Sequence, residues 1–247
     1  MKIVAIIQSR MTSTRLPGKA LVDIAGKPLT GWIVDRARQC RRLDEVVLAI
    51  PAEPEDDPLA RRFSSSCRIH RGSLHDVLDR YWSAAKDSGA DAVVRVCGDN
   101  PLFEAPIMDA AVERFLAAGV DYANTLGCPI GIGAEVFRYD ALDRAHREAT
   151  EAYQHEHVTP YLYESPGRFR TTGFDMSDLT HGVGKSGVRL TVDTPEDLEV
   201  IREIFKRLLP LNLQFGLKEI ADLIRADGAL FKKNLHVRQK SFKESET

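Results

Sequence analysis

A basic loop directly follows the first apolar segment of this chain. Residues 2–8 read KIVAIIQ, a near-continuous apolar run with several β-branched residues, which is typical of a strand covered on both faces in a parallel sheet. The next segment contains Arg10, Arg15, Gly18 and Lys19 among Ser and Thr residues. Ligands of open α/β sheets bind at the carboxyl ends of the strands, so these groups favour a polyphosphate ligand over a merely solvated loop.

The types of these residues suggest how a phosphate chain would be held. Gly18 allows the backbone to approach a phosphate closely, and Lys19 can reach it as a point charge, so we assign Lys19 to a phosphate of this ligand. Arg10 and Arg15 can each bind phosphate oxygens through two N–H groups, and Arg15 would also suit charge stabilisation in a transition state. Which arginine contacts which phosphate stays open.

Two aspartates are candidate metal ligands. Asp99 follows the run DAVVRVC (91–97) and Asp193 ends the run VRLTVD (188–193), so both are expected at the carboxyl edge of the sheet. Each also has an ordinary structural explanation, as a turn residue for Asp99 and a helix-capping anion for Asp193. Together with the basic loop they favour Mg²⁺, because a polyphosphate site normally holds a divalent ion with oxygen ligands. No residue stands out as a general base.

Composition excludes several classes of function. The 247-residue chain has a net charge of −2 and 43% hydrophobic residues, whereas a nucleic-acid or membrane-surface binder needs a basic field. The four cysteines are widely spaced without a C-x-x-C pair, so neither a zinc site nor a disulfide framework is predicted. No apolar run is long enough for a membrane span, and a strand is expected where a signal peptide would lie. We therefore expect a cytoplasmic protein.

Alternating strand-like and helical patterns predict a parallel α/β sheet. Strand-like runs occur at 3–8, 45–50, 67–71 and 91–97. The helical patterns between and after them begin at Pro28 and cover 76–86 and 105–118. The tryptophans Trp32 and Trp82 fall on the apolar faces of the first two helices, so we interpret both as packing groups rather than base-stacking platforms.

The pattern changes after Asp121. Shorter strands, several glycines and an interrupted helix near 141–164 predict a smaller antiparallel or mixed subregion over about 121–187. The expected strand 188–193 is then followed by a helix from Pro195 to about Leu209.

Thr194 is placed to cap this helix, and the Asp197 side chain is available for the reciprocal hydrogen bond to the Thr194 backbone. The residues after 231 are polar and charged. We predict one domain over 1–231 and a loose polar tail over 232–247.

Several segments together resemble one known family. The chain is similar to the cytidylyltransferases that activate sugar acids, such as CMP-Kdo and CMP-sialic acid synthetases, and most to the spore coat polysaccharide biosynthesis protein F branch. The resemblance covers roughly residues 1–205, in family order. It rests on IIQSRMTSTRLPGKAL (6–21), RGSLHDVLDRY (71–81), VRVCGDNPL (94–102), EHVTPYLY (156–163) and LTVDTPEDL (190–198).

The resemblance implies a fold, a reaction and a nucleotide site. The fold would be a Rossmann-like three-layer α/β nucleotidyltransferase with a small mixed subregion for the acceptor and for dimer contacts. The reaction would transfer CMP from CTP to a Kdo-like or nonulosonic sugar acid for surface polysaccharide synthesis, with Mg²⁺ and release of pyrophosphate. The implied contacts to cytosine and ribose are Gln8, Ser9, Arg10, Met11, Thr12 and Ser13, together with Arg71, Gly72 and Ser73.

The acceptor side is implied more weakly, and other functions stay open. The candidate acceptor contacts are Asn124, Thr125, Glu135, His155 and Glu156, while a helix-surface role for the two last residues is an equal alternative. A homodimer is expected from the family. The alternatives are a nucleotidyltransferase acting on a phosphonate or a sugar phosphate, and a catalytically silent nucleotide-binding partner. The presence of Lys19, Asp99 and Asp193 argues against a catalytically silent protein.

Overall fold

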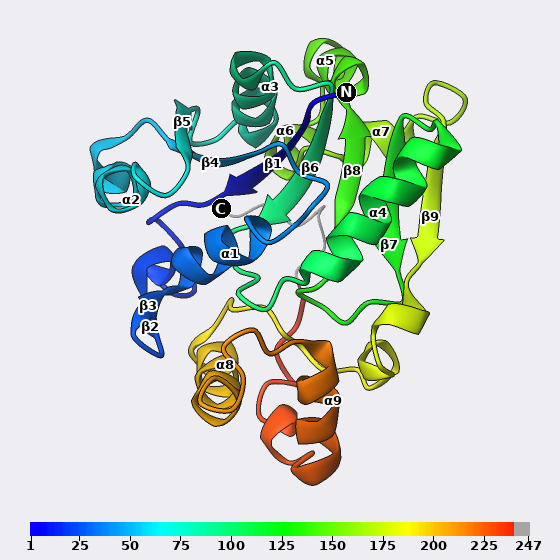
Figure 1. Ribbon diagram of the computed structural model, residues 1–247. Helices are drawn as coiled ribbons and strands as arrows, with labels where there is room; N and C mark the ends of the chain where they lie inside the picture. The colour runs from blue at the N-terminus through cyan, green and yellow to red at the C-terminus, as the bar shows by residue number, and fades with distance from the viewer. Residues whose placement is uncertain (240–247) are drawn as a thin grey trace.

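A mostly parallel sheet runs through the molecule. The computed structural model describes residues 1–239, and seven strands form one sheet in the order β5-β4-β1-β6-β8-β7-β9 (Figure 1). In chain order these strands are β1 (Ile3–Gln8), β4 (Glu45–Pro51), β5 (Arg68–Gly72), β6 (Ala92–Cys97), β7 (Tyr122–Leu126), β8 (Glu135–Arg138) and β9 (Thr171–Asp175). A separate two-stranded hairpin joins β2 (Asp23–Ile24) to β3 (Lys27–Pro28).

β1 occupies the centre of the parallel half. It pairs in parallel with β4 on one side and with β6 on the other, and residues 3–7 are buried. This explains the continuous apolar run, because a central strand of such a sheet has no solvent-facing side. β8 runs antiparallel to both of its neighbours, β6 and β7.

Helices cover both faces of the sheet. Leu29 and Ile33 of α1 (Leu29–Ala37), with α2 (Asp57–Phe63) and α4 (Ala105–Ala118), pack on one face. The other face is covered by α3 (Val77–Ser88), α5 (Tyr139–Glu148), α6 (Ala152–His157) and α7 (Pro160–Glu164). The predicted three-layer α/β fold is therefore confirmed, and so are the helices predicted at 76–86 and 105–118.

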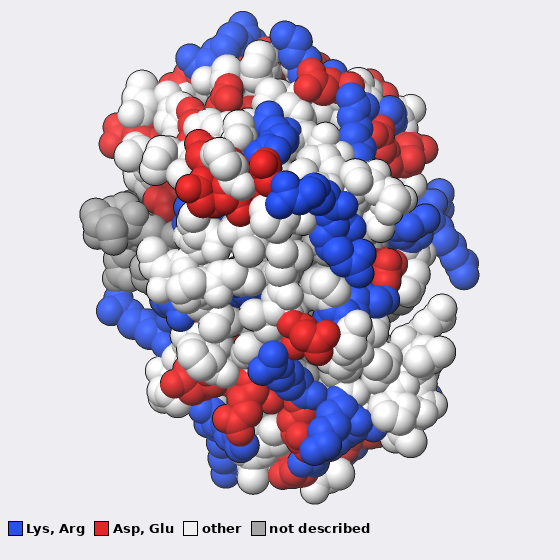
Figure 2. All heavy atoms as spheres, turned by 90° about the vertical axis from the view of Figure 1, so that its left-hand side faces the viewer, with Lys and Arg blue, Asp and Glu red and all other residues white. Residues whose placement is uncertain are grey.

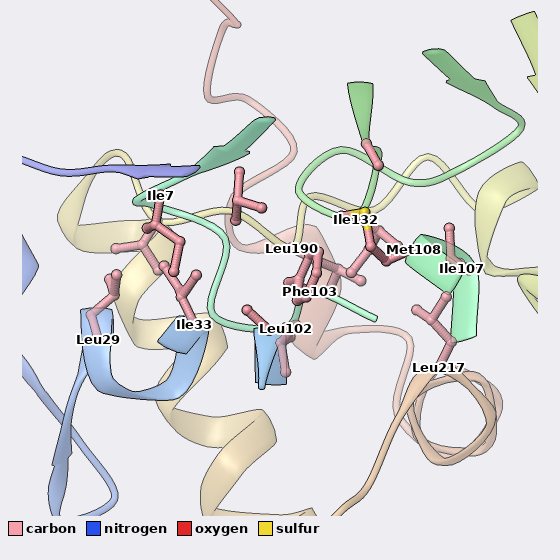
Figure 3. Packing of buried hydrophobic residues seen from close by; sticks show 14 of the residues in the cluster. Ile7, Leu29, Ile33, Leu102, Phe103, Ile107, Met108, Ile132, Leu190 and Leu217 are labelled. Atoms are coloured by element: carbon pink, nitrogen blue, oxygen red, sulfur yellow. The ribbon is translucent and has the colours of Figure 1, made fainter. Parts of the chain in front are cut away.

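Two further helices lie beyond the carboxyl ends of the parallel strands. α8 (Pro195–Leu208) and α9 (Leu217–Ala226) occupy the lower part of Figure 1. Their apolar faces continue the core, and Figure 3 shows Leu190 near the loop residue Phe103 and Leu217 near Ile107. The predicted cap of α8 is confirmed, because the Thr194 hydroxyl accepts from the backbone N–H of Asp197 in a capping box. These helices therefore place the chain around residue 193 at the edge of the sheet.

The strand predicted at 188–193 is wrong. Only a single β-bridge, between Ile130 and Arg189, involves this segment. Its backbone N–H groups bond to the loops that leave the sheet, with Leu190 N donating to Ile130 O at 2.8 Å and Val192 N donating to Asp99 O at 2.8 Å. The apolar alternation reflects burial among loops beneath the sheet edge. That environment produces the same pattern as a strand.

The surface mixes both signs of charge. Figure 2 shows Lys and Arg beside Asp and Glu over the face that carries α2 and β5. Within residues 1–239, no helix is long and apolar enough to cross a membrane.

The described part of the predicted tail is anchored. Asn234 is fully buried, and its amide Nδ2 donates to Asp197 Oδ1 at 2.8 Å and to the carbonyl of Arg189 at 3.3 Å. Gln239 accepts a hydrogen bond from Arg189 Nη1 at 2.8 Å. The sequence predicted a loose tail over 232–247, but residues 232–239 contribute to the site-bearing edge instead, and 240–247 lie outside the described residues. Composition alone could not reveal a single buried amide.

We expect Asn234→Ala to lower the free energy of unfolding by about 2 kcal/mol, because the buried Asp197 carboxylate loses a hydrogen-bond donor. Urea denaturation measures this effect. The exposed Asn212, changed to Ala in the same way, should cost less than about 0.5 kcal/mol. Equal losses for the two variants would contradict the anchoring role of Asn234.

Candidate functional site

The basic loop leaves β1 and folds back on itself. Ser9 N donates to Ala49 O at 3.2 Å, which ties the start of the loop to β4. The carbonyl of Met11 then accepts from both Ser13 N and Gly18 N at 3.0 Å. Gly18 has a φ of 71°, a left-handed conformation that glycine adopts without strain. The turn delivers Lys19, the next residue, toward the carboxyl edge of the sheet.

The end of β6 approaches this loop closely. A Cβ on Gly98 would lie 2.2 Å from the carbonyl oxygen of Gln8, so a larger residue would force the two strand ends apart. Glycine at this position therefore keeps Asp99, the next residue, beside the basic loop.

Lys19 joins the two candidate metal ligands. Its Nζ lies 3.5 Å from Asp99 Oδ2 and 3.2 Å from Asp193 Oδ1, and it donates to the carbonyl of Val192 at 3.0 Å. Arg15 Nη2 lies 3.1 Å from Asp193 Oδ1. The structure therefore brings together Arg15, Lys19, Asp99 and Asp193. These are the four residues that the sequence analysis assigned to phosphate and metal binding.

Arg189 is a site residue that the sequence analysis missed. Its Nη2 lies 3.2 Å from Asp193 Oδ2, and Nε and Nη2 donate to the fully buried Asp197. Asp197 also accepts from the backbone N–H groups of Asp193 and Thr194. This network fixes the Asp193 carboxylate from behind. The i, i+4 spacing of Arg189 and Asp193 was visible in the sequence, but in the strand predicted there the two residues would lie on one face about 13 Å apart, too far for an ion pair.

The ionisation of the site follows from burial and from the ion pairs. Burial would lower the pKa of Lys19, but attraction to Asp99 and Asp193 outweighs it and raises this pKa above its ordinary value. Burial raises the pKa of Asp99 despite the nearby lysine. Burial would also raise the pKa of Asp193, yet Lys19 and Arg15 hold it below its ordinary value. Lys19 therefore stays cationic at neutral pH.

Asp99 and Asp193 suit a cation that prefers oxygen ligands. An oxygen of each carboxylate contacts the Lys19 ammonium, which marks a position between them where cationic charge is stabilised. Within residues 1–239, no cluster of three or more Asp, Glu, His or Cys side chains is arranged to hold a metal. Two protein carboxylates with substrate phosphates completing the shell is the usual arrangement for Mg²⁺. The donor set therefore fits that ion.

A second polar cluster lies beside the loop. Asp56 is fully buried and accepts from the backbone N–H of Met11 at 2.7 Å. Arg80 is 2% exposed and donates to the carbonyl of Ser73. Asp56 Oδ2, Glu53 Oε2 and Arg80 Nε are buried and have no hydrogen-bond partner among the described residues. Such atoms are rare in folded proteins unless a ligand or water satisfies them.

The residues assigned by resemblance to cytosine and ribose border this cluster. Gly72 ends β5, and a Cβ there would lie 3.1 Å from Arg80 Cγ. The Ser73 hydroxyl accepts from the backbone N–H of Asp76 at 2.9 Å. Arg71 points its guanidinium to Asp57 Oδ1 at 2.5 Å and to two carbonyls of the 52–53 segment. Its side chain thus braces the start of α2.

The remaining loop candidates differ in their surroundings. Thr12 is exposed, whereas Ser9 is buried and its hydroxyl lies 3.4 Å from that of Thr30 in α1. The Ser13 hydroxyl accepts from Leu16 N at 3.4 Å. Arg10 is half-buried, and its charge helps to lower the pKa of Arg80, after the larger effect of burial.

The acceptor candidates on β7 and β8 divide between the two faces of the sheet. Asn124 and Glu135 are register partners, and they lie on the face covered by α5, α6 and α7. Glu135 accepts from Tyr122 and from Thr159, and it pairs with Arg95. Thr125 points to the opposite face, where its hydroxyl accepts from Ala134 N at 2.8 Å. Thr125 therefore shapes a loop and lies apart from Glu135.

His155 connects two helices. Nδ1 lies 2.8 Å from Asp76 Oδ2 at the start of α3, and Nε2 lies 3.1 Å from the carbonyl of Ala149. Both ring nitrogens are thus engaged in holding α6 against α3. Glu156 is half-buried beside it. The acceptor role and the helix-surface role of this pair both stay predictions.

Comparison with known proteins identifies the family. Residues 4–232 match the cytidylyltransferase family. The chain belongs to this family. It is a CTP-dependent nucleotidyltransferase. The resemblance that the five sequence segments indicated is thereby confirmed.

Two relatives match over most of their lengths. This cytidylyltransferase is 35% identical to an uncharacterised protein of Methanocaldococcus jannaschii, over 100% of both chains. It is 33% identical to the spore coat polysaccharide biosynthesis protein SpsF of Bacillus subtilis, over 83% of this chain and 87% of that protein.

Two solved structures share the fold. A cytidylyltransferase from Leptospira borgpetersenii has a TM-score of 0.84 and 25% identity, and the match covers 98% of this chain and 99% of that one. CMP:2-keto-3-deoxy-manno-octonic acid synthetase, in a complex with CTP, has a TM-score of 0.64 and 20% identity. That match covers 84% of this chain and 99% of the synthetase.

We expect Lys19→Ala to weaken CTP binding by roughly 10- to 100-fold, because the triphosphate loses a charged hydrogen-bond donor. CMP binding should change far less, since CMP has no β or γ phosphate. Calorimetry with both nucleotides measures the difference. Lys27→Ala, which removes a half-buried lysine paired with Asp35, is the control. Equal losses of affinity for CTP and CMP would show that Lys19 does not contact the β and γ phosphates.

Proposed function

We propose that this cytidylyltransferase transfers CMP from CTP to a sugar acid and releases pyrophosphate, in the synthesis of a surface polysaccharide. The observation that carries the proposal is the convergence of Lys19 and Arg15 with Asp99 and Asp193 at the end of β1. The likeness to SpsF and to a synthetase that makes a CMP-activated sugar acid supports the choice of acceptor.

Positioning and electrostatics are the chemistry that these residues offer. Lys19 and Arg15 would bind triphosphate oxygens and exchange their present contacts with the carboxylates for contacts with phosphate. Asp99 and Asp193 would hold Mg²⁺, while Arg189 keeps the Asp193 carboxylate in place. When bound, Mg²⁺ would neutralise charge on the triphosphate and on the departing pyrophosphate.

The second polar cluster supports a base site next to this phosphate site. Asp56 and Glu53 each have a buried oxygen that needs a donor, and Arg80 has a buried N–H that needs an acceptor. Cytosine presents an exocyclic amine and a carbonyl, so it can satisfy both kinds of group. Uracil carries a carbonyl in place of the amine, so it would leave carboxylate oxygens unpaired.

Pyrophosphate release with a panel of acceptors tests the proposal. The panel contains sugar acids, sugar phosphates and phosphonates, each offered with CTP and with UTP. We expect release with CTP and a sugar acid, and roughly 10⁴-fold lower kcat/KM with UTP, because a mispaired polar edge is strongly rejected. Product mass identifies the nucleotide transferred. Release only with phosphonates or sugar phosphates would replace the acceptor class, and no release with any acceptor would favour a silent binding partner.

We expect Asp99→Asn and Asp193→Asn each to lower kcat by roughly 100-fold or more, because each removes charge from the proposed Mg²⁺ site. Turnover against Mg²⁺ concentration measures this, with circular dichroism to verify the fold. Asp35→Asn, in α1 and paired with Lys27 rather than with a site residue, should keep normal turnover. Near-normal activity of either site variant at saturating Mg²⁺ would remove that aspartate from the site. The homodimer stays a prediction.

A further inference from the structure

A buried ionic cluster lies on the sheet beside the proposed reaction site. Arg95 in β6 pairs with Glu135 in β8 through Nη1 and Oε2 at 2.5 Å. Glu135 Oε1 accepts from the hydroxyls of Tyr122 at 2.6 Å and Thr159 at 2.8 Å. Arg95 Nε donates to Gln8 Oε1 at 3.3 Å. The side chains of Arg95 and Glu135 are 14% and 21% exposed, so the cluster retains contact with solvent.

The composition of this cluster is unusual for its place. The same face of β6 carries Val93 in an apolar core, and an arginine two residues further on must be paired to be tolerated there. Burial would raise the pKa of Glu135, but Arg95 and the hydrogen bonds from Tyr122 and Thr159 hold it below its ordinary value. The pair is therefore ionised. An apolar pair would pack here at lower cost, which indicates that the charges are retained for a ligand.

Backbone strain helps to build the cluster. Val158 is fully buried and has a φ of 71°, a conformation that a β-branched residue rarely adopts. It forms the turn between α6 and α7 and is followed directly by Thr159, which donates to Glu135. Strain of this kind gathers at ligand sites, where the surrounding structure holds it in place. The aromatic rings of Tyr122 and Tyr163, 5.8 Å apart, border the same turn.

The cluster is adjacent to the catalytic edge. Gln8 is the last residue of β1, just before the basic loop, and it pairs with Cys97 in the sheet register. Asp99 follows Cys97 by two residues. A molecule whose hydroxyl reached the edge could therefore extend its other groups along the sheet toward Arg95.

The guanidinium has one edge suited to an anion. Glu135 holds Nη1, while the contact from Nε to Gln8 is long at 3.3 Å. An arginine presents Nε and Nη2 as two parallel N–H groups that match a carboxylate. Rotation of the Gln8 side chain would open this edge, and the Gln8 amide could then donate to the same anion.

We propose that Arg95 binds the carboxylate of the sugar-acid acceptor, with Glu135 as the positioning residue that holds the guanidinium and with Gln8 as the group displaced on binding. This inference rests on the proposed function and adds the residue that makes the enzyme select an acid. Glu135 itself contacts Arg95, Tyr122 and Thr159, so its role in acceptor binding is indirect.

The test compares each acceptor with its uncharged form. The probes are 3-deoxy-manno-octulosonate and N-acetylneuraminate, each as the free acid and as the methyl ester, with CTP and Mg²⁺. We expect the unaltered enzyme to prefer an acid over its ester by roughly 30-fold or more in kcat/KM. Arg95→Gln should bring this ratio near one, and Arg95→Lys, which keeps a cation for Glu135, should leave it in between. The KM for CTP should stay within about twofold.

Arg138→Gln is the matched control. Arg138 lies on the neighbouring strand β8 and also pairs with a carboxylate, that of Asp121, but at the opposite end of the strand from Glu135. This variant should keep the full preference for the acid. If Arg95→Gln loses CTP binding through misfolding, Arg95→Lys decides the matter by its acid-to-ester ratio.

The outcomes separate this inference from the proposed function. Turnover of a sugar acid with the acid-to-ester preference intact in the Arg95 variants overturns the role of Arg95 and leaves the proposed function standing. Equal loss of acid and ester also overturns it, because that result indicates a structural role. Release of pyrophosphate with sugar phosphates or phosphonates but with neither acid overturns both.

Discussion

The ion cluster around Asp193 is the interaction on which the rest of this structure depends. Lys19 comes from the loop after β1, Asp99 from the end of β6, and Arg189 and Asp197 from the turn that begins α8. Buried charges must be paired, so these segments hold one another at a single point. The cost of burying them is offset by mutual attraction and by backbone donors. The result is an edge at which ion pairs join three segments of the chain.

The same edge has two distinct flanks. On one side the basic loop borders Asp56 and Arg80, where buried polar atoms have no hydrogen-bond partner among the described residues. On the other side Gln8 leads to Arg95 and the antiparallel strand β8. A nucleotide on the first flank and an acidic acceptor on the second would meet at Lys19.

The antiparallel strand has a structural consequence for specificity. In a fully parallel sheet the neighbour of β6 would end at this edge. β8 instead starts at the edge, so Glu135, its first residue, stands opposite Arg95. The strained turn at Val158 brings Thr159 against the same carboxylate. Five separate segments, β1, β6, β7, β8 and the turn at Val158, thereby contribute to one polar cluster in an otherwise apolar face.

The sequence by itself determined the parallel core, the helices on its faces, and the edge at which Lys19, Asp99 and Asp193 meet. Each of these follows from local periodicity, from the direction of parallel strands, or from family motifs. Only the tertiary structure decided that residues 188–193 lie among loops and that Asn234 is buried. It also decided that Arg189 pairs with Asp193 and that Arg95 pairs with Glu135. Burial among loops produces the same alternation as a strand. The pairing of Arg95 with Glu135 leaves no local pattern, because the two residues lie far apart in the chain and meet only in the folded sheet. The pairing of Arg189 with Asp193 was hidden because the segment was predicted as a strand.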